Sequence, residues 1–260
     1  MLNISRDVLH LMKHKTSPLP VRTLFLILLN LVFPVFGADP RATVEESHQK
    51  WEKEITAIEN RDARTDSNKH GIVFVGSSSI RKWTSLTEDF PEHHVLNHGF
   101  GGSQLSDAVY FADRLVLAYE PTFIVVYAGG NDINAKKTPE QVFESYCAFV
   151  TRIRETQPET PIAYISIAGN PKRWSQVPEV IKTNGMIETF TKQHPGLLFI
   201  DVFHPMLALN GLPRPEIFSN DNLHMNAEGY KLWAKIVGPY LPSSAGSKKE
   251  TETATATIQK

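Results

Sequence analysis

The chain has 260 residues, 41% hydrophobic and 21% charged, which is ordinary for one α/β domain and short for two. Its 27 basic and 28 acidic side chains leave a formal net charge of −1. No broad positive field is present, which excludes nucleic-acid partners and binding to anionic membrane surfaces.

The N-terminus has the pattern of a secretory signal. Arg22 precedes an apolar stretch at residues 24–36, and the small residues Gly37 and Ala38 follow it. The stretch is shorter than the roughly 20 residues of a membrane-spanning helix. We therefore expect a signal peptide at residues 1–37, a secreted or periplasmic protein, and no stable membrane insertion after cleavage. An uncleaved anchor is the alternative.

The predicted elements then alternate in chain order. An amphipathic helix is expected within residues 38–64. Strands are expected at residues 72–75, 95–96, 123–127, 162–167 and 198–202, and helices at 106–118, 139–157, 177–194 and 227–240. Continuous apolar strands between helices predict a parallel sheet covered on both faces. The fold class is α/β, a flavodoxin-like five-stranded three-layer α/β/α sandwich over residues 38–242, with active groups at the carboxyl ends of the strands.

Two segments carry little function. Residues 243–260 contain almost nothing to bury, so a disordered tail is expected there. Cys147 is the single cysteine and belongs to the apolar pattern of the helix at 139–157, which predicts a buried core thiol.

Two short motifs follow the first two strands. The sequence Gly-Ser-Ser-Ser-Ile at residues 76–80 places serines on a strand-to-helix turn, where a hydroxyl is lifted out of the sheet. The sequence Asn-His-Gly-Phe-Gly-Gly-Ser at residues 97–103 offers glycines that let a backbone N–H approach a developing oxyanion. A helix cap and a flexible connection are the alternatives for these motifs.

Two further motifs lie later in the chain. Gly-Gly-Asn-Asp at residues 129–132 ends the most hydrophobic strand, where Asn131 can offer an amide donor to the same oxyanion. Asp221 stands three residues before His224, so that its carboxylate can hold Nδ1–H and leave Nε2 free to accept a proton. A loop turn and a structural Asp–His pair are the alternatives. Asn226 is the predicted N-cap of the last helix.

Together these motifs resemble those of the SGNH (GDSL-like) hydrolases, in their order and separations, over about residues 72–240. The resemblance is closest to an exported bacterial branch of acetylhydrolases whose first block reads Gly-Ser-Ser-Ser-Ile. It implies a carboxylic ester hydrolase in which Ser78 attacks, His224 acts as base and then acid, and Asp221 orients it.

The resemblance also implies an oxyanion hole. The backbone N–H groups of Ser78 and Gly102 and the side-chain amide of Asn131 would form it. The family's usual Asp before the nucleophile is Ser77 here, and this departure leaves open which of Ser77, Ser78 and Ser79 attacks.

The expected substrate is a small-molecule or carbohydrate ester with a small acyl group, acetyl in particular. Trp83 and Trp174 are candidates for stacking on a sugar ring, with burial in the core as the alternative. No cofactor is expected, and no metal, because His224 and Glu228 lack a third ligand and His98 has no recognisable ligand spacing.

Other functions remain alternatives. They are a long-chain lipase or thioesterase of the same fold, a non-catalytic carbohydrate-binding module, and a phosphohydrolase. The sequence does not determine the oligomeric state.

Overall fold

The computed structural model describes residues 48–64 and 69–243. The predicted signal peptide at residues 1–37 lies outside the described residues, and so does the predicted tail apart from Ser243. Within the described ranges, no helix is both long enough and apolar enough to cross a bilayer.

Five parallel strands form one sheet in the order β2-β1-β3-β4-β5. They are β1 (Ile72–Gly76), β2 (Val95–Gly99), β3 (Phe123–Tyr127), β4 (Ile162–Ile165) and β5 (Leu197–Ile200). The predicted flavodoxin-like α/β sandwich is confirmed. The second strand is longer than predicted because residues 97–99 continue the parallel pairing with β1. The side chain of Asn97 also donates from Nδ2 to the carbonyl oxygens of Ile80 and Trp83, at 2.7 and 3.1 Å.

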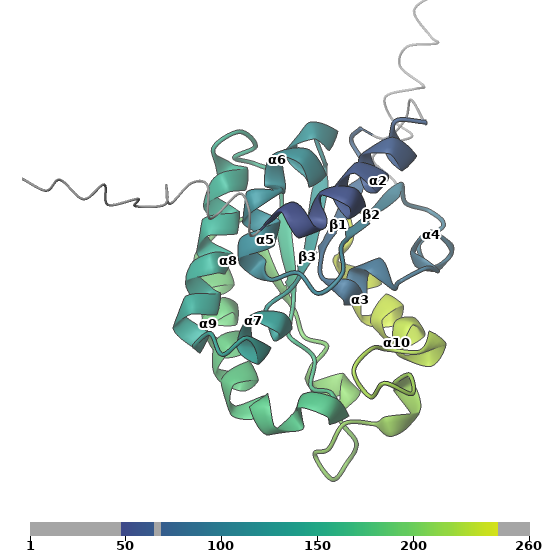
Figure 1. Ribbon diagram of the computed structural model, residues 1–260, viewed down its shortest axis with the longest axis vertical. Coiled ribbons are helices and arrows are strands. Elements are labelled where there is room, and N and C mark those ends of the chain that lie inside the picture. Colours follow the sequence, from purple (N-terminus) through teal and green to yellow (C-terminus); the bar gives the residue numbers. More distant parts are fainter. Residues whose placement is uncertain (1–47, 65–68, 244–260) are drawn as a thin grey trace, which may run out of the picture. The chain divides into compact units, whose positions relative to one another are not determined.

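Helices cover both faces of this sheet (Figure 1). They are α2 (Glu52–Asp62), α3 (Ser78–Arg81), α4 (Leu86–Asp89), α5 (Leu105–Tyr110), α6 (Ala112–Leu115), α7 (Gly130–Asn134), α8 (Pro139–Arg154), α9 (Val177–Gln193) and α10 (Ala227–Val237). Short 3-10 turns lie at Gln49–Trp51 (η1), Leu117–Tyr119 (η2), Pro171–Gln176 (η3), His204–Met206 (η4), Pro215–Ile217 (η5) and Gly238–Tyr240 (η6).

The core is divided by the sheet into two apolar clusters. Along β1, Val73 and Val75 join the cluster formed with α2, α5, α8 and α9, whereas Ile72 and Phe74 join the cluster formed with α10. This division follows the period of two in a strand, which sends successive side chains to opposite faces. Every residue of β1 and β3 is buried, as a parallel sheet covered on both sides requires.

One predicted helix is interrupted. The helix expected at residues 106–118 is two short helices, α5 and α6, joined at Phe111, whose backbone (φ −92°, ψ 9°) leaves the helical region. Phe111 is fully buried, and its ring lies edge-on to Phe100 at 5.8 Å. Packing of this ring between the strand end and the helices overrides the local helical pattern.

The buried pair of His98 and Asp62 is structural. His98 Nε2 lies 2.8 Å from Asp62 Oδ2, and its Nδ1 lies 2.5 Å from the carbonyl oxygen of Leu115. Both ring nitrogens of this fully buried side chain therefore face acceptors within the fold. The contact ties α2 to β2.

Candidate active site

The strand-to-helix turn after β1 presents one serine to the surface. Gly76 has φ +141°, and a Cβ there would lie 2.0 Å from the carbonyl oxygen of Tyr127, so the turn requires glycine. Ser77 caps the helix in extended conformation, and α3 begins at Ser78. Ser77 and Ser79 are 5% and 7% exposed, whereas Ser78 is partly exposed. The turn thus buries both neighbours and leaves the Ser78 hydroxyl accessible.

The loop before α10 brings an imidazole to this hydroxyl. His224 Nε2 lies 2.8 Å from Ser78 Oγ, although the two residues are 146 positions apart. The loop is held by Asn226, whose side chain caps α10 at the N–H of Gly229 (3.1 Å), as predicted. The two ends of the domain therefore meet at one edge of the sheet.

A carboxylate orients this imidazole. Asp221 Oδ2 lies 2.6 Å from His224 Nδ1, and Oδ1 accepts hydrogen bonds from the backbone N–H groups of Leu223 and His224 at 3.0 and 2.9 Å. Partial burial opposes ionisation, but these hydrogen bonds prevail and hold the pKa of Asp221 well below its ordinary value. Because the ionised carboxylate only accepts, Nδ1 carries the proton and Nε2 is left to accept from Ser78.

A lysine beside this pair was missed in the sequence. Lys82 Nζ lies 3.1 Å from His224 Nδ1 and 3.6 Å from Asp221 Oδ2. Since Nδ1 donates to the carboxylate, the ammonium acts as a neighbouring positive charge rather than as a donor to the ring. The only sequence signal is its position four residues after Ser78, one helical turn away.

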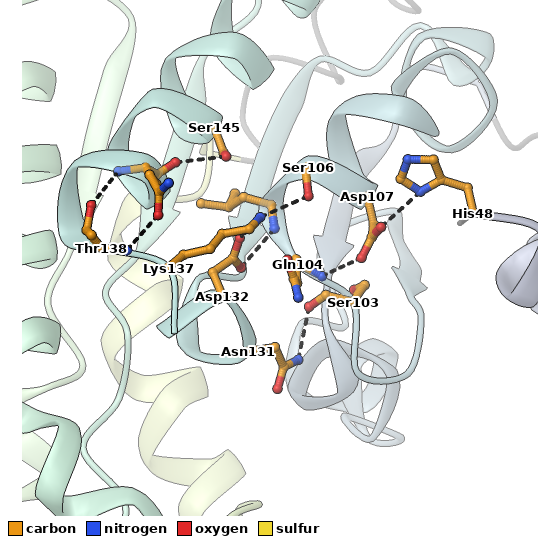
Figure 2. Close-up of polar contacts among 12 residues, drawn as sticks. His48, Ser103, Gln104, Ser106, Asp107, Asn131, Asp132, Lys137, Thr138 and Ser145 are labelled. Atoms are coloured by element: carbon orange, nitrogen blue, oxygen red, sulfur yellow. Dashed lines mark hydrogen bonds and ion pairs between the residues drawn. The ribbon is translucent and has the colours of Figure 1, made fainter. Parts of the chain in front are cut away.

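Asn131 lines the same cavity as Ser78 and His224. Its Nδ2 donates to the carbonyl oxygen of Ser103 at 2.9 Å (Figure 2). An amide group has two N–H donors, so a second one remains for a substrate oxygen. Gly102 has φ +71° and is exposed, but it is not among the residues that line the cavity around Ser78. Its part in an oxyanion hole stays a prediction.

A buried carboxylate holds the two glycine-containing motifs together. Asp132 is fully buried, and it accepts hydrogen bonds from the N–H of Leu105 (3.0 Å) and from Lys137 Nζ (2.9 Å). Burial raises the pKa of Asp132, and Lys137 opposes that change. Figure 2 shows the carboxylate joining the start of α7 to the start of α5. Asp132 therefore fixes Asn131 relative to Ser103.

These groups line a small cavity of about 30 Å³. Ser78, His224 and Asn131 lie on its wall with Tyr127, Ile167 and Ala168. The remaining lining residues are Ser77, Ser79, Gly130, Asn170, Arg173 and Leu223. Arg173 was also missed in the sequence. It follows β4, as Ser78 follows β1 and Asn131 follows β3, and this position was its sequence signal.

The prediction that Trp83 binds substrate is wrong. Its side chain is fully buried and packs on Phe74, Phe90, Tyr230 and Trp233, with ring centroids 5.5–5.8 Å apart. Its Nε1 donates to Asp89 Oδ2 at 2.6 Å. Trp83 follows α3, and its indole points into the core beside α10, where no sugar ring can reach it.

Two other residues that the sequence singled out, Trp174 and Cys147, are both half-buried. Trp174 is half-buried on η3 and does not line the cavity around Ser78, so a role in substrate binding stays a prediction. Cys147 is half-buried on α8 rather than fully buried, and burial raises the pKa of its thiol. A raised pKa keeps the thiol protonated and unreactive.

The arrangement supplies the parts of nucleophilic catalysis. A hydroxyl contacts the free nitrogen of an oriented imidazole, and an amide donor shares the same cavity. In the described part of the chain, no group of three or more His, Cys, Asp or Glu side chains is arranged to hold a metal ion.

Comparisons with known proteins agree with this geometry. The model of the GDSL-like Lipase/Acylhydrolase family matches residues 66–232. A comparison with curated proteins finds no match. Among solved structures, a Streptococcus pneumonia protein described as a candidate platelet activating factor superposes with a TM-score of 0.67 at 19% identity, covering 78% of this chain and 98% of its own.

Two solved esterases share the fold at lower similarity. A carbohydrate esterase family 3 protein from Talaromyces cellulolyticus has a TM-score of 0.55 at 17% identity, covering 66% of this chain and 95% of its own. An acetyl esterase solved with an acetate ion has a TM-score of 0.53 at 16% identity, with the same two coverages of 66% and 95%. At identities this low, the structural similarity establishes a common fold and nothing more.

Proposed function

Because the chain belongs to the GDSL-like lipase/acylhydrolase family and is an ester hydrolase, we propose that it removes small acyl groups, acetyl in particular, from an alcohol or carbohydrate. Ser78 is the proposed nucleophile, His224 the base and Asp221 its orienting carboxylate. The observation that carries the proposal is the 2.8 Å contact between Ser78 Oγ and His224 Nε2.

The reaction proceeds in two steps. Ser78 Oγ attacks the ester carbonyl carbon while its proton passes to His224 Nε2, and Asp221 stabilises the resulting imidazolium. The tetrahedral intermediate collapses as His224 gives the proton to the leaving alcohol, which leaves an acyl-enzyme on Ser78. Water then attacks the acyl carbon, with His224 again as the base, and the acid is released.

Donors around the carbonyl oxygen stabilise the negative charge of each intermediate. The free N–H of Asn131 and the backbone N–H groups of Ser78 and Gly102 are the proposed donors. Such donors act strongly because they are aimed before the charge develops and need no reorganisation.

The size of the cavity supports a small acyl group. The cavity beside Ser78 has a volume of only about 30 Å³, and Ile167 and Ala168 contribute apolar side chains to its wall. A small acyl group such as acetyl suits a space of this size. The solved acetyl esterase and carbohydrate esterase with this fold are consistent with the same substrate class.

Serine substitutions test the nucleophile. Ser78→Ala is expected to lower kcat on the order of a million-fold and to prevent covalent labelling by a fluorophosphonate. Ser77→Ala and Ser79→Ala are matched controls in the same turn, and both proteins are expected to remain labelled. Labelling of the Ser78→Ala protein at another serine would refute the assignment.

A substrate series tests the acyl preference. Nitrophenyl esters of increasing chain length, with acetylated xylan beside them, are expected to give the highest kcat/KM for acetyl. Faster hydrolysis of long chains would instead identify a lipase or thioesterase.

The proposed site of action is outside the cytoplasm. The proposal rests on the signal-like pattern of residues 1–37. N-terminal sequencing of the protein purified from its native cells tests it, since an intact N-terminus would contradict cleavage near Gly37.

A further inference from the structure

Arg173 is a cation in the catalytic cavity without a carboxylate partner among the described residues. Its Nη1 donates to the carbonyl oxygen of Gly130 at 3.1 Å and to Asn131 Oδ1 at 3.0 Å. Both acceptors are neutral, and no ion pair of Arg173 exists within residues 48–64 and 69–243. Other arginines of the domain, such as Arg114 with Glu52 and Glu59, contact carboxylates directly.

The contact with Arg173 determines which way the Asn131 amide points. Oδ1 faces the guanidinium donor, and Nδ2 faces the carbonyl oxygen of Ser103 at 2.9 Å (Figure 2). A flipped amide would set two donors together at Arg173 and two acceptors together at Ser103. Only the observed orientation lets both the oxygen and the nitrogen of the amide form hydrogen bonds. It directs the NH₂ group toward Ser103 and away from Arg173.

The position of Arg173 is itself held by the backbone. Its N–H donates to Asn170 Oδ1 at 3.0 Å, which caps the turn η3. The next contact of this turn, from the N–H of Lys172 to the carbonyl oxygen of Asn222 at 3.0 Å, joins it to the loop that carries His224. The backbone of this turn is therefore attached to the loop that carries His224, while the guanidinium contacts Asn131.

The guanidinium has no carboxylate among the described residues to draw it away from its two oxygen acceptors. Partial burial lowers the pKa of Arg173 because it removes the guanidinium partly from water. The hydrogen bonds to the carbonyl oxygen of Gly130 and to Asn131 Oδ1 therefore replace part of its hydration and keep Nη1 on the amide.

We propose that Arg173 is a positioning residue that holds the Asn131 amide with its free N–H toward the oxyanion. The inference rests on the proposed role of Asn131 as an oxyanion donor. Arg173 acts through Asn131, so its effect on the reaction requires that amide to be present.

A double-mutant cycle tests this dependence. With the neutral substrate nitrophenyl acetate, Asn131→Ala is expected to lower kcat about 100- to 1,000-fold. Arg173→Met is expected to lower kcat about 10- to 100-fold while KM changes less than about twofold, since a misoriented donor affects the transition state more than substrate binding. In the Asn131→Ala background, Arg173→Met is expected to change kcat by less than about threefold.

Two more variants complete the design. Arg173→Lys keeps the charge and one donor, so an intermediate loss of kcat is expected, and this loss should also vanish in the Asn131→Ala background. It supplies the same cycle if Arg173→Met does not fold, as judged by Tm. Arg152→Met is the matched control, because Arg152 is a partly buried arginine of α8, paired with Glu155 and Asp113, and its kcat should be unchanged.

Each other result overturns the inference in a distinguishable way. Losses that multiply in the double mutant would mean that Arg173 acts independently of Asn131. A rise in KM confined to anionic esters such as a nitrophenyl hemisuccinate would make Arg173 a substrate-binding residue instead. An unchanged kcat in Asn131→Ala would overturn the oxyanion role of Asn131, and with it the inference, while the Ser78 nucleophile would be unaffected.

Discussion

Truncation of Trp83 separates a core residue from a substrate-binding one. Trp83→Ala removes a fully buried indole that contacts four aromatic rings of the α10 side of the core. Emptying such a site costs about 3–5 kcal/mol of unfolding free energy. In a domain of about 150–250 residues each kcal/mol lowers Tm by about 2–4 °C, so a fall of about 6–20 °C is expected.

Trp83→Phe is the matched control. It keeps a ring in the cluster but loses the hydrogen bond from Nε1 to Asp89, which costs about 1–2 kcal/mol together with the smaller ring. Its Tm should lie between those of the wild type and Trp83→Ala.

The assay combines thermal unfolding with kinetics at a temperature where both variants are folded. KM for nitrophenyl acetate and for acetylated xylan should be unchanged per folded molecule. A raised KM for the sugar substrate at an unaltered Tm would refute the core assignment and restore the ligand-stacking hypothesis.

Further substitutions probe charges at and away from the site. Asp221→Asn keeps the shape but removes the charge that holds the imidazole tautomer, so kcat should fall on the order of 10,000-fold; a loss below about tenfold contradicts the orienting role. Burial alone would raise the pKa of Asp62, but hydrogen bonds from His98 and a neighbouring arginine lower it to about 2 from 3.8. A depressed carboxyl pKa contributes stability that is present above pH 3.8 and is lost as pH falls toward 2, so the free energy of unfolding should fall by about 2 kcal/mol across that window. His98→Asn should flatten this dependence in acid unfolding curves, and an unaltered slope would contradict the assignment.

Local sequence patterns determined the architecture. The apolar runs at β1 and β3 predicted buried parallel strands because both faces of such strands meet helices, and every residue of both strands is buried. The cap at Asn226 was also predicted, since a cap depends on a few neighbouring residues. Where packing competes with local preference, as at Phe111, the sequence pattern predicted a helix that the fold interrupts.

The motifs also placed the candidate site at the carboxyl ends of the strands. Once four chemically suited motifs follow strands of one parallel sheet, the topology brings them to the same edge. Asp221 and His224 are three residues apart, so their contact could be predicted from spacing. The contact of His224 with Ser78, across 146 positions, depended on the fold.

Only the tertiary structure decided the exposure and the partners of individual side chains. The sequence could not distinguish Ser78 from Ser77 and Ser79, because the turn at Gly76 and its packing on β3 determine which hydroxyl reaches solvent. For the same reason, Trp83 was predicted to bind substrate but lies in the core, whereas Arg173 was not singled out in the sequence but lines the catalytic cavity. Burial and hydrogen-bond geometry result from segments far apart in the chain, and residue spacing does not encode them.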